Sequence, residues 1–364
     1  MAKVRLGDYV RIRTGKLDAN AADQNGKYPF FTCSIVPLCI NTYSYDCECV
    51  LVAGNGDLNV KYYNGKFDAY QRTYIVESLN NKLLTVPYLY RFMEKYIETL
   101  RNISIGGVIK YIKLGNLTEA NINLPTVSKQ NEIVDVISNV DNLIKEAEQQ
   151  LADLDILVKS RFIEMFGDPI TNTKRWPADK VEAVCSNIYG GGTPSKSKEE
   201  YWNGDIPWIS SKDMKSDMIS DSQIRITNLG LDNSSAKLVP INSVIMVIRS
   251  GILKHTLPVA INTVPVTVNQ DLKVFIPSAS IHYRFLAFLF KMLEKDILAR
   301  VRAVTADNIE FDTLKNRKII LPPVQLQNQF ASFVTQVDKS KLAIQQSLDE
   351  LEILKKSLMQ QYFG

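Results

Sequence analysis

The chain is poor in the residues that most enzymes use for chemistry. Its 364 residues include only two histidines, His255 and His282, so neither a histidine-based metal site nor a duplicated Ser–His–Asp site is expected. The sequence also has no Gly-x-x-x-x-Gly-Lys phosphate loop and no Gly-x-Gly-x-x-Gly dinucleotide motif. We therefore predict no catalytic residue, no metal and no cofactor in the chain itself.

Long hydrophobic runs are missing as well. The longest, Phe285 to Phe290, is far too short to span a membrane. Residues 1–13 lack the apolar core of a signal peptide. These absences predict a cytoplasmic protein without a membrane partner.

Cysteine is scarce and odd in number. Four of the five cysteines, Cys33, Cys39, Cys47 and Cys49, cluster early in the chain, and the fifth is Cys185. Their spacing does not match a two-plus-two zinc pattern, and Cys47 and Cys49 would point to the same side of a strand. We favour small apolar core thiols over a zinc site, and reduced thiols over disulfides.

Neither sign of charge is in large excess. Lysine and arginine number 43 against 39 aspartate and glutamate, a net charge of +4. This mild basicity permits a nucleic-acid partner without demanding one, because non-specific DNA binders are usually more basic.

The sequence does contain a long internal repeat. The segment from Leu124 to Gly167 returns without a gap as Leu321 to Gly364, and 16 of the 44 aligned pairs are identical. The identical pairs include Gln130 with Gln327. Two similar units in one polypeptide favour a pseudo-twofold molecule, which is suited to a two-part target.

Each repeat carries apolar residues at alternating steps of four and three, the pattern of a coiled-coil helix. Each helix should run for about 35–40 residues, or roughly 50–60 Å. We favour packing of the two helices on each other as a spacer over two solvated helices, because sustained heptads need a partner helix. Lysines stand at two seam positions of the second copy, so these layers should lie at the edge of the seam or meet another subunit. The predicted seam comprises Ile133, Ile137, Val140, Ile144, Ala147, Leu151, Leu154 and Val158, then Phe330, Val334, Val337, Lys341, Ile344, Leu348, Leu351 and Lys355.

The region before each long helix reads as a mainly β globule. Short apolar runs bounded by Gly, Asn, Pro or Asp predict strands, and a helix is expected at Val86–Arg101 and at His282–Arg300. The second globule has about twenty extra residues, mostly between Gly204 and Gly251. The predicted fold class is α+β, with two β-rich globular domains separated by two long antiparallel helices. The expected domains are residues 1–123, 124–167, 168–320 and 321–364.

Loops of both globules carry residue types that suit DNA. The glycine-rich stretch from Ile188 to Lys198 combines bare backbone, hydroxyls and lysines in what should be a flexible loop. Lysines and tyrosines interleave between Lys61 and Lys66. This pattern suits contact with the DNA backbone together with stacking or groove contact, and it equally fits a half-buried hairpin. Gln71-Arg72 and Arg249 add side chains that read base edges. A plain surface turn is the alternative for each stretch, and their joint presence in both globules favours DNA.

These residues resemble the specificity subunit of a type I restriction–modification system. The resemblance covers the whole chain and rests on the duplication and on a few motifs. They are Gly191-Gly-Thr-Pro-Ser195, Gly204-Asp-Ile-Pro-Trp-Ile-Ser-Ser-Lys-Asp-Met214, Ala53-Gly-Asn-Gly-Asp57 with Lys61-Tyr-Tyr-Asn-Gly-Lys66, and the two Leu-Pro-x-Val-x-x-Gln segments that begin the long helices.

The resemblance implies a non-catalytic DNA-specificity subunit. Each globule would be a target recognition domain that reads, in the major groove, one half of an interrupted double-stranded DNA sequence. The helices would set the half-site spacing and dock two methyltransferase subunits, which bind S-adenosylmethionine and methylate adenine at N6. Motor and nuclease subunits would join such a complex.

The candidate site residues follow from the motifs. For DNA they are Lys16, Asn55, Lys61, Tyr63, Lys66, Arg72, Lys110, Thr193, Ser195, Lys196, Lys198, Lys212, Arg249 and Lys254. For methyltransferase docking or helix packing they are Ile133, Ile137, Val140, Leu151, Leu154, Phe330, Val334, Val337, Leu348 and Leu351.

Two features limit the resemblance. The second helix is expected to end at Gly364 without a further segment. Gly106 to Lys110 corresponds to Ala303 to Asp307, which keeps neither glycine nor lysine, so a DNA contact there is expected mainly in the first half. One alternative is an adaptor with two protein-binding modules on a coiled-coil strut. A metal-dependent enzyme with paired sites is another, but it predicts matching acidic or histidine clusters that are not found.

Overall fold

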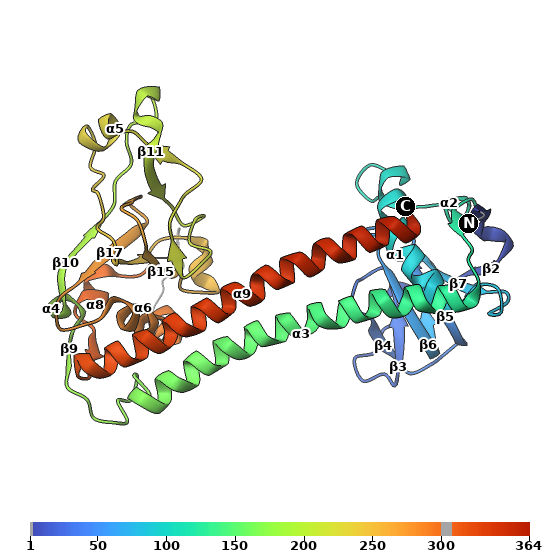
Figure 1. Cartoon of the computed structure of the whole chain (residues 1–364), viewed down its shortest axis with the longest axis horizontal. Coiled ribbons are helices and arrows are strands. Elements are labelled where there is room, and N and C mark those ends of the chain that lie inside the picture. Colours follow the sequence, from blue (N-terminus) through green and yellow to red (C-terminus); the bar gives the residue numbers. More distant parts are fainter. Residues whose placement is uncertain (1–2, 300–307) are drawn as a thin grey trace. The chain divides into compact units, whose positions relative to one another are not determined.

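The computed structural model describes residues 3–299 and 308–364, which form two compact units (Figure 1). The first unit comprises residues 1–150 and 344–364, and the second comprises residues 151–343. The two longest helices, α3 (Val127–Phe166) and α9 (Val324–Phe363), each contribute to both units. Each is 40 residues long, so the predicted helix length is confirmed, and so is the α+β class.

The first unit is built on a six-stranded sheet in the order β2-β7-β5-β6-β3-β4. All neighbours are antiparallel except β3 and β6, where Phe30 pairs with Asp68 in a parallel ladder. A separate antiparallel pair, β1 with β8, joins the two ends of the globule. The strands are β1 (Lys3–Arg5), β2 (Val10–Thr14), β3 (Tyr28–Phe31), β4 (Leu38–Ile40), β5 (Tyr45–Ala53), β6 (Val60–Ala69), β7 (Thr73–Ser78) and β8 (Asn121–Asn123). The helices are α1 (Val86–Ile103) and α2 (Leu114–Thr118), with short turns η1 (Leu6–Asp8) and η2 (Ala19–Ala21).

The second unit repeats this plan with additions. A five-stranded sheet runs β10-β17-β14-β15-β12, and a three-stranded sheet runs β13-β11-β16. Trp208 of β11 pairs in parallel with Thr267 of β16, as Phe30 does with Asp68, and β9 pairs with β18 as β1 does with β8. The strands are β9 (Ala178–Lys180), β10 (Cys185–Gly190), β11 (Trp202–Ile209), β12 (Met218–Ile219), β13 (Arg225–Ile226), β14 (Val244–Val247), β15 (Val259–Asn262), β16 (Thr267–Val268), β17 (Leu272–Pro277) and β18 (Lys318–Ile320). The helices are α4 (Val181–Val184), α5 (Asn228–Asp232), α6 (Tyr283–Met292), α7 (Glu294–Leu298) and α8 (Phe311–Lys315), with turns η3 (Glu199–Tyr201) and η4 (Gly251–Lys254).

The extra residues of the second globule form β12, β13 and α5, inside the predicted interval. Trp208, Ile226 and Ala236 make a small core of their own here, apart from the main core of the unit. Elements that lie on an added core can change without disturbing the main one.

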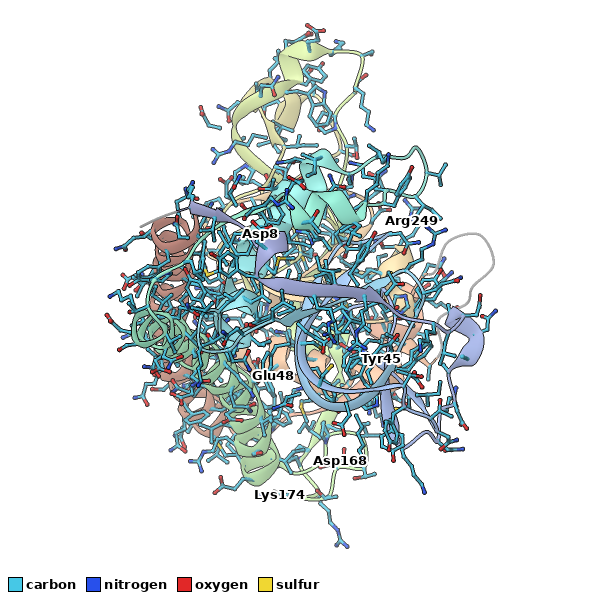
Figure 2. The ribbon with its side chains drawn as sticks, turned by 90° about the vertical axis from the view of Figure 1, so that its right-hand side faces the viewer. Asp8, Tyr45, Glu48, Asp168, Lys174 and Arg249 are labelled. Carbon is cyan, nitrogen blue, oxygen red and sulfur yellow. The ribbon has the colours of Figure 1, made fainter. Side chains whose placement is uncertain are left out.

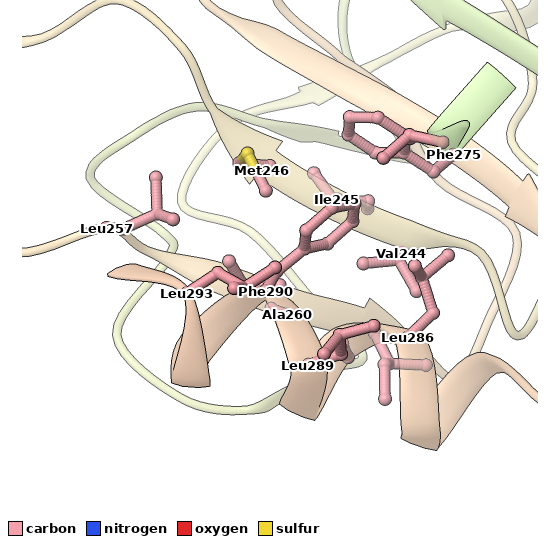
Figure 3. Close-up of a cluster of buried hydrophobic side chains, with 14 of the residues drawn as sticks. Val244, Ile245, Met246, Leu257, Ala260, Phe275, Leu286, Leu289, Phe290 and Leu293 are labelled. Carbon is pink, nitrogen blue, oxygen red and sulfur yellow. The ribbon is translucent and has the colours of Figure 1, made fainter. Parts of the chain in front are cut away.

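The main core of the second unit packs one face of α6 on the sheet. Leu286, Leu289 and Phe290 are spaced to share a helix face and meet Val244 and Ile245 of β14 (Figure 3). Burial of each such side chain contributes roughly 1.5–3 kcal/mol. The helix predicted at His282–Arg300 is two helices, because α6 ends before Leu293 and α7 begins at Glu294. Arg300 lies outside the described residues, as do Ala303 to Asp307.

The coiled-coil seam is confirmed by burial. All sixteen predicted seam positions are buried or half-buried, and most residues between them are exposed. In the first unit Ile133 and Ile137 share a core with Met359, and in the second Phe162 and Phe166 contact Phe330. The beginning of each long helix therefore packs near the end of the other, which is an antiparallel pair.

The two seam lysines lie at the edge of the helix pair. Lys355 Nζ is 2.6 Å from Asp141 Oδ1, and Lys341 pairs with Asp155. The exposed fractions of the two lysine side chains are 34% and 27%. Each ammonium can therefore keep an aspartate and water as partners while its methylenes cover the seam.

The prediction of core thiols for the four clustered cysteines is right for Cys49, which is buried, and wrong for Cys39, which is exposed at the edge strand β4. Cys33 and Cys47 are half-buried, and Cys185, outside that prediction, is buried. Burial raises the pKa of the Cys185 thiol to about 12. No cluster of three or more potential metal ligands occurs within residues 3–299 and 308–364. Over the same residues, no helix is long and apolar enough to cross a membrane.

Candidate nucleic-acid interface

In the first unit, four loops meet where strands end. We call the segments Gly15–Leu17, Gly54–Asp57, Gln71–Arg72 and Ile105–Tyr111 the first loop cluster. Backbone hydrogen bonds join them: Gly54 N–H donates to Arg72 O (2.8 Å), Gln71 N–H to Leu17 O (2.9 Å) and Gly56 N–H to Lys110 O (2.9 Å). Loops far apart in sequence therefore form one continuous surface.

Four of the candidate DNA residues lie on this first loop cluster. Lys16, Arg72 and Lys110 are exposed, and Asn55 is half-buried in a backbone bridge with Tyr111. Three cations and one amide on adjoining loops suit phosphate contact together with reading of a base edge.

The other three first-half candidates make their contacts elsewhere. Lys61 is half-buried, donates to Asn59 Oδ1, and has a pKa lowered by desolvation. Tyr63 packs its ring 5.0 Å from that of Phe31, and the Lys66 ammonium lies 4.7 Å from the Tyr43 ring. For Tyr63 the half-buried hairpin is therefore the better interpretation, and Lys61 supports the loop that Asn59 organises.

The second unit gathers equivalent loops. We call Gly191–Thr193, Ile248–Arg249, Gln270–Asp271 and Asn308–Ile309 the second loop cluster. Ile248 N–H and Arg249 N–H donate to Asp271 O at 2.9 and 3.2 Å, and Ile309 N–H donates to Ile248 O at 2.8 Å. Thr193 Oγ1 hydrogen-bonds to Gln270 Oε1. The bond from Ile309 repeats one in the first unit, where Ile112 N–H donates to Gly54 O.

Arg249 occupies the position that Asn55 holds in the first unit. Both residues form an isolated backbone bridge with the loop before a long helix, Asn55 with Tyr111 and Arg249 with Asn308. The Arg249 guanidinium is exposed (Figure 2) and lies 2.6 Å from Asp271 Oδ1. One carboxylate thus orients the guanidinium, and the exposed remainder can donate to a guanine edge.

The glycine-rich stretch is held in place, which corrects the expectation of a flexible loop. Trp208 Nε1 donates to Gly192 O (2.9 Å), and Trp202 Nε1 donates to Ser195 O (3.1 Å). A side chain at Gly192 would place its Cβ 2.4 Å from Ser235 C and 2.5 Å from Ala236 N, so only glycine fits. The Gly-Asp-Ile-Pro-Trp motif therefore serves to fix the loop, a role that its sequence did not reveal.

The remaining second-half candidates lie around this fixed loop and beyond it. Ser195 Oγ is 2.9 Å from Ser197 Oγ, and Lys196 is exposed. The exposed Lys198 ammonium donates to Tyr201 Oη at 3.1 Å. Lys212 lies in the turn capped by Asp213, and Lys254 ends η4.

The ten candidates for docking or helix packing all lie on the covered face of the long helices. Ile133, Ile137, Val140, Phe330, Val337 and Leu348 are buried, and the other four are half-buried. The large apolar residues that the long helices leave exposed are different ones: Leu143, Ile156, Leu157, Ile163, Val324, Leu342, Ile353 and Leu354. Seam periodicity finds the inner face of such a pair and misses the outer one.

A repeated glutamine fixes each globule to its long helix. The fully buried Gln130 accepts from Thr85 N–H (2.8 Å) and donates to Leu83 O (2.7 Å) and Pro125 O (2.9 Å). We call this arrangement the glutamine clamp.

Gln327 makes the same three bonds in the second unit. It accepts from His282 N–H (2.8 Å) and donates to Ser280 O (3.2 Å) and Pro322 O (2.8 Å). All partners are shifted by the 197 residues that separate the repeats. The identity of the two glutamines in the repeat was the available signal for this clamp, and composition or periodicity alone does not reveal it.

The model of the family "Type I restriction modification DNA specificity domain" matches residues 1–154 and 179–353. The chain belongs to this family. The two matched segments show that the family domain occurs twice.

Individual specificity-domain proteins are similar to parts or all of the chain. The type I restriction enzyme EcoDI specificity subunit of Escherichia coli is 40% identical over 152 residues, which are 42% of this chain and 33% of that subunit. The EcoR124I/EcoR124II specificity subunit of Escherichia coli is 29% identical over 280 residues, 74% of this chain and 68% of that subunit. The matches therefore span between a third and two thirds of these relatives' own length.

Solved structures share the fold of this specificity-domain protein. The S subunit of a type I restriction–modification system from M. genitalium has a TM-score of 0.64 at 15% identity, covering 100% of this chain and 96% of that one. A chain from a study of complex assembly in the type I R-M system has a TM-score of 0.62 at 17% identity, covering 100% and 97%.

Proposed function

We propose that the chain is the DNA-specificity subunit of a type I restriction–modification complex and reads a bipartite, interrupted DNA target. The observation that carries the proposal is the pair of equivalent loop clusters, one on each copy of the family domain. Residues 1–123 and 168–320 act as recognition domains, each reading one half-site. Residues 124–167 and 321–364 form the helical spacer that sets the distance between half-sites.

Recognition by each cluster combines two kinds of contact. Exposed lysines such as Lys16, Lys196 and Lys198 bind phosphates and fix the register, while Asn55 and Arg249 read base edges. The difference between an amide and a guanidinium at equivalent positions supports different base preferences for the two half-sites. A shared framework with different reading side chains suits a target with unlike halves.

Two methyltransferase subunits dock on the long helices. The exposed apolar residues of α3 and α9 support this proposal, because large apolar side chains on an otherwise polar helix face mark interaction surfaces. The partners supply S-adenosylmethionine and the chemistry that methylates adenine at N6, and flipping brings the base to them. Motor and nuclease subunits complete the restriction complex. Assembly of this kind places the chain in the cytoplasm, beside the chromosome.

The test is a genome-wide map of N6-methyladenine in cells that co-express the chain with the methyltransferase encoded beside it. We expect one interrupted motif that disappears when the chain is omitted. Arg249→Ala is expected to relax one half of the motif, and Asn55→Ala the other half. A stable complex that binds S-adenosylmethionine but produces no motif would contradict the proposal and favour a protein-binding adaptor. Binding that does not weaken with salt would favour the adaptor too.

A further inference from the structure

One part of the first loop cluster is apolar where its neighbours are polar. Ile105 and Tyr111 exchange two backbone hydrogen bonds, Ile105 N–H to Tyr111 O (3.0 Å) and Tyr111 N–H to Ile105 O (2.8 Å). We call the hairpin Ile105–Tyr111 the tip hairpin. At its end Val108 is fully exposed, and Ile109 is 61% exposed.

The tip hairpin has a well-defined stem. Gly106 has φ +116°, and a Cβ there would lie 2.4 Å from Ile109 O, so the turn requires glycine. Gly56 N–H donates a hydrogen bond to Lys110 O at 2.9 Å, and Ile112 N–H donates one to Gly54 O at 2.9 Å. The turn and the stem therefore keep Val108 and Ile109 pointing away from the core instead of letting them fold back onto it.

The neighbours of this tip identify its partner. It adjoins Asn55 through the backbone bridge to Tyr111, and its own Lys110 is exposed. Cations and an amide on this surface suit DNA, and Val and Ile can neither donate nor accept a hydrogen bond. In the major groove, the apolar group on a base edge is the C5-methyl of thymine.

We propose that Val108 and Ile109 contact a thymine methyl group in the half-site read by the first recognition domain. The proposal rests on the function proposed above and adds a specificity determinant to it. Asn55 is suited to adenine, so the amide and the apolar tip would read the two strands of an A·T pair or of neighbouring pairs.

The experiment replaces each thymine of the first half-site with deoxyuridine, which removes only the methyl group. Binding of these duplexes to the chain in complex with its methyltransferase subunits is measured by fluorescence anisotropy. One substitution should weaken binding about three- to fivefold, the effect of one buried methyl group. The V108S/I109S variant should bind the thymine and uracil duplexes equally. Its salt dependence should stay as in the unmodified chain, since an apolar contact releases no counterion.

The matched control is L79S/L83S, which makes the same chemical change at two exposed leucines outside the cluster. This control should keep the discrimination between thymine and uracil. Equal binding of all duplexes by the unmodified complex, or a first half-site without thymine on either strand, would overturn the proposal. Loss of methyltransferase binding in V108S/I109S would overturn it as well and assign the tip to that partner. A complex without preference for any sequence would instead refute the proposed function.

Discussion

The two units differ most where they are exposed and least where polar groups are buried. Gln130 and Gln327 keep every bond of the clamp, although the globules around them have diverged. At the loop clusters, by contrast, the equivalent positions hold an amide in one unit, Asn55, and a guanidinium in the other, Arg249. A buried amide with three partners tolerates little change because each lost bond leaves an unpaired group. An exposed loop has no such constraint, so its side chains can change while the framework persists.

The acidic partners of the long helices show the same contrast on a smaller scale. Arg91 pairs with Asp141 at 2.7 Å, and Arg284 pairs with Asp338 at 2.6 Å, so both units tie a globule to a helix by an equivalent aspartate. The arginines stand one helical turn apart in the aligned repeats. The ion pair with the long helix is therefore present in both units, while the position of its arginine differs.

Removing the clamp should have the largest effect. Gln130→Leu and Gln327→Leu each leave one N–H and two carbonyls without their partner, at about 1–3 kcal/mol per group. We expect each variant to lower the free energy of unfolding by roughly 3 kcal/mol or more, with similar losses for the two. Chemical denaturation followed by circular dichroism measures this, and Gln346→Leu, on an exposed face of α9, is the control. Unequal losses in the free energy of unfolding would show that the two clamps share their geometry and differ in their contribution to stability.

The second largest loss of stability is expected when a glycine in a tight strand-to-loop turn is replaced by alanine. The Cβ of an alanine at Gly191 would lie 1.9 Å from Val268 O, and at Gly15 it would lie 2.2 Å from Ala69 O. Gly191→Ala and Gly15→Ala should each cost about 1–3 kcal/mol through backbone displacement. Gly107→Ala has open space around its Cβ and should change stability little. Thermal unfolding compares the three, and a neutral Gly191→Ala would contradict the close approach.

Exchange of the reading side chains sharpens the comparison at the interface. Arg249→Asn places in the second unit the residue type of the first, and should cost about 1–3 kcal/mol of discrimination at one base pair. The altered position should lie in one half-site only, as read from methylation maps or binding to a duplex library. Asp271→Ala, which frees the guanidinium, should broaden specificity at that same position. A change in both half-sites would argue against independent reading.

The smallest expected effect is a loss of stability at low pH, at the N-terminus of α6. His282 and Thr85 hold the same helix N-cap position, His282 accepting from Arg284 N–H through Nδ1 (3.2 Å) and Thr85 from Tyr88 N–H through Oγ1 (3.4 Å). Burial, then the nearby Arg284, lower the pKa of His282 below its ordinary 6.5. The unfolded chain therefore binds the proton more readily, and stability of α6 is lost as pH falls below about 6.5.

Because a protonated Nδ1 cannot accept, the loss should approach the worth of one N-cap, about 1 kcal/mol. The protection of amides in the first turn of α6, measured against the intrinsic exchange rate at each pH, should fall on acidification, while that of α1 should not. His282→Thr is expected to abolish the difference. An equal loss of protection in both helices would indicate a general acid effect instead.

Sequence alone predicts the parts of this molecule that depend on periodicity and on local identity. The seam from Ile133 to Val158 was predictable because a buried stripe on a helix recurs at fixed steps. The place of His282 before a predicted helix left a cap or a plain surface residue as its two interpretations, and the structure shows the cap.

The sequence did not predict contacts between distant segments. The hydrogen bond from Trp208 to Gly192 and the ion pair between Asp271 and Arg249 depend on the order of the strands in the sheets. The spacing of residues along the chain does not encode that order. The outer apolar face of the long helices was missed for another reason, since its exposed leucines and isoleucines do not follow the period of the seam. The candidate sites were therefore predicted at the level of loops, and their geometry came from the fold.

The pairing of β1 with β8, and of β9 with β18, brings the first and last strands of each globule side by side, with Lys3 opposite Asn123 and Lys180 opposite Lys318. Because the chain enters and leaves each globule at adjacent strands, a globule resembles a cassette inserted into a common connector, the pair of long helices. Exchange of one such cassette between related genes would leave the connector and the other cassette intact. Under the proposed function, a new target sequence would then arise by recombination in a single step, without the slow accumulation of substitutions in a working interface.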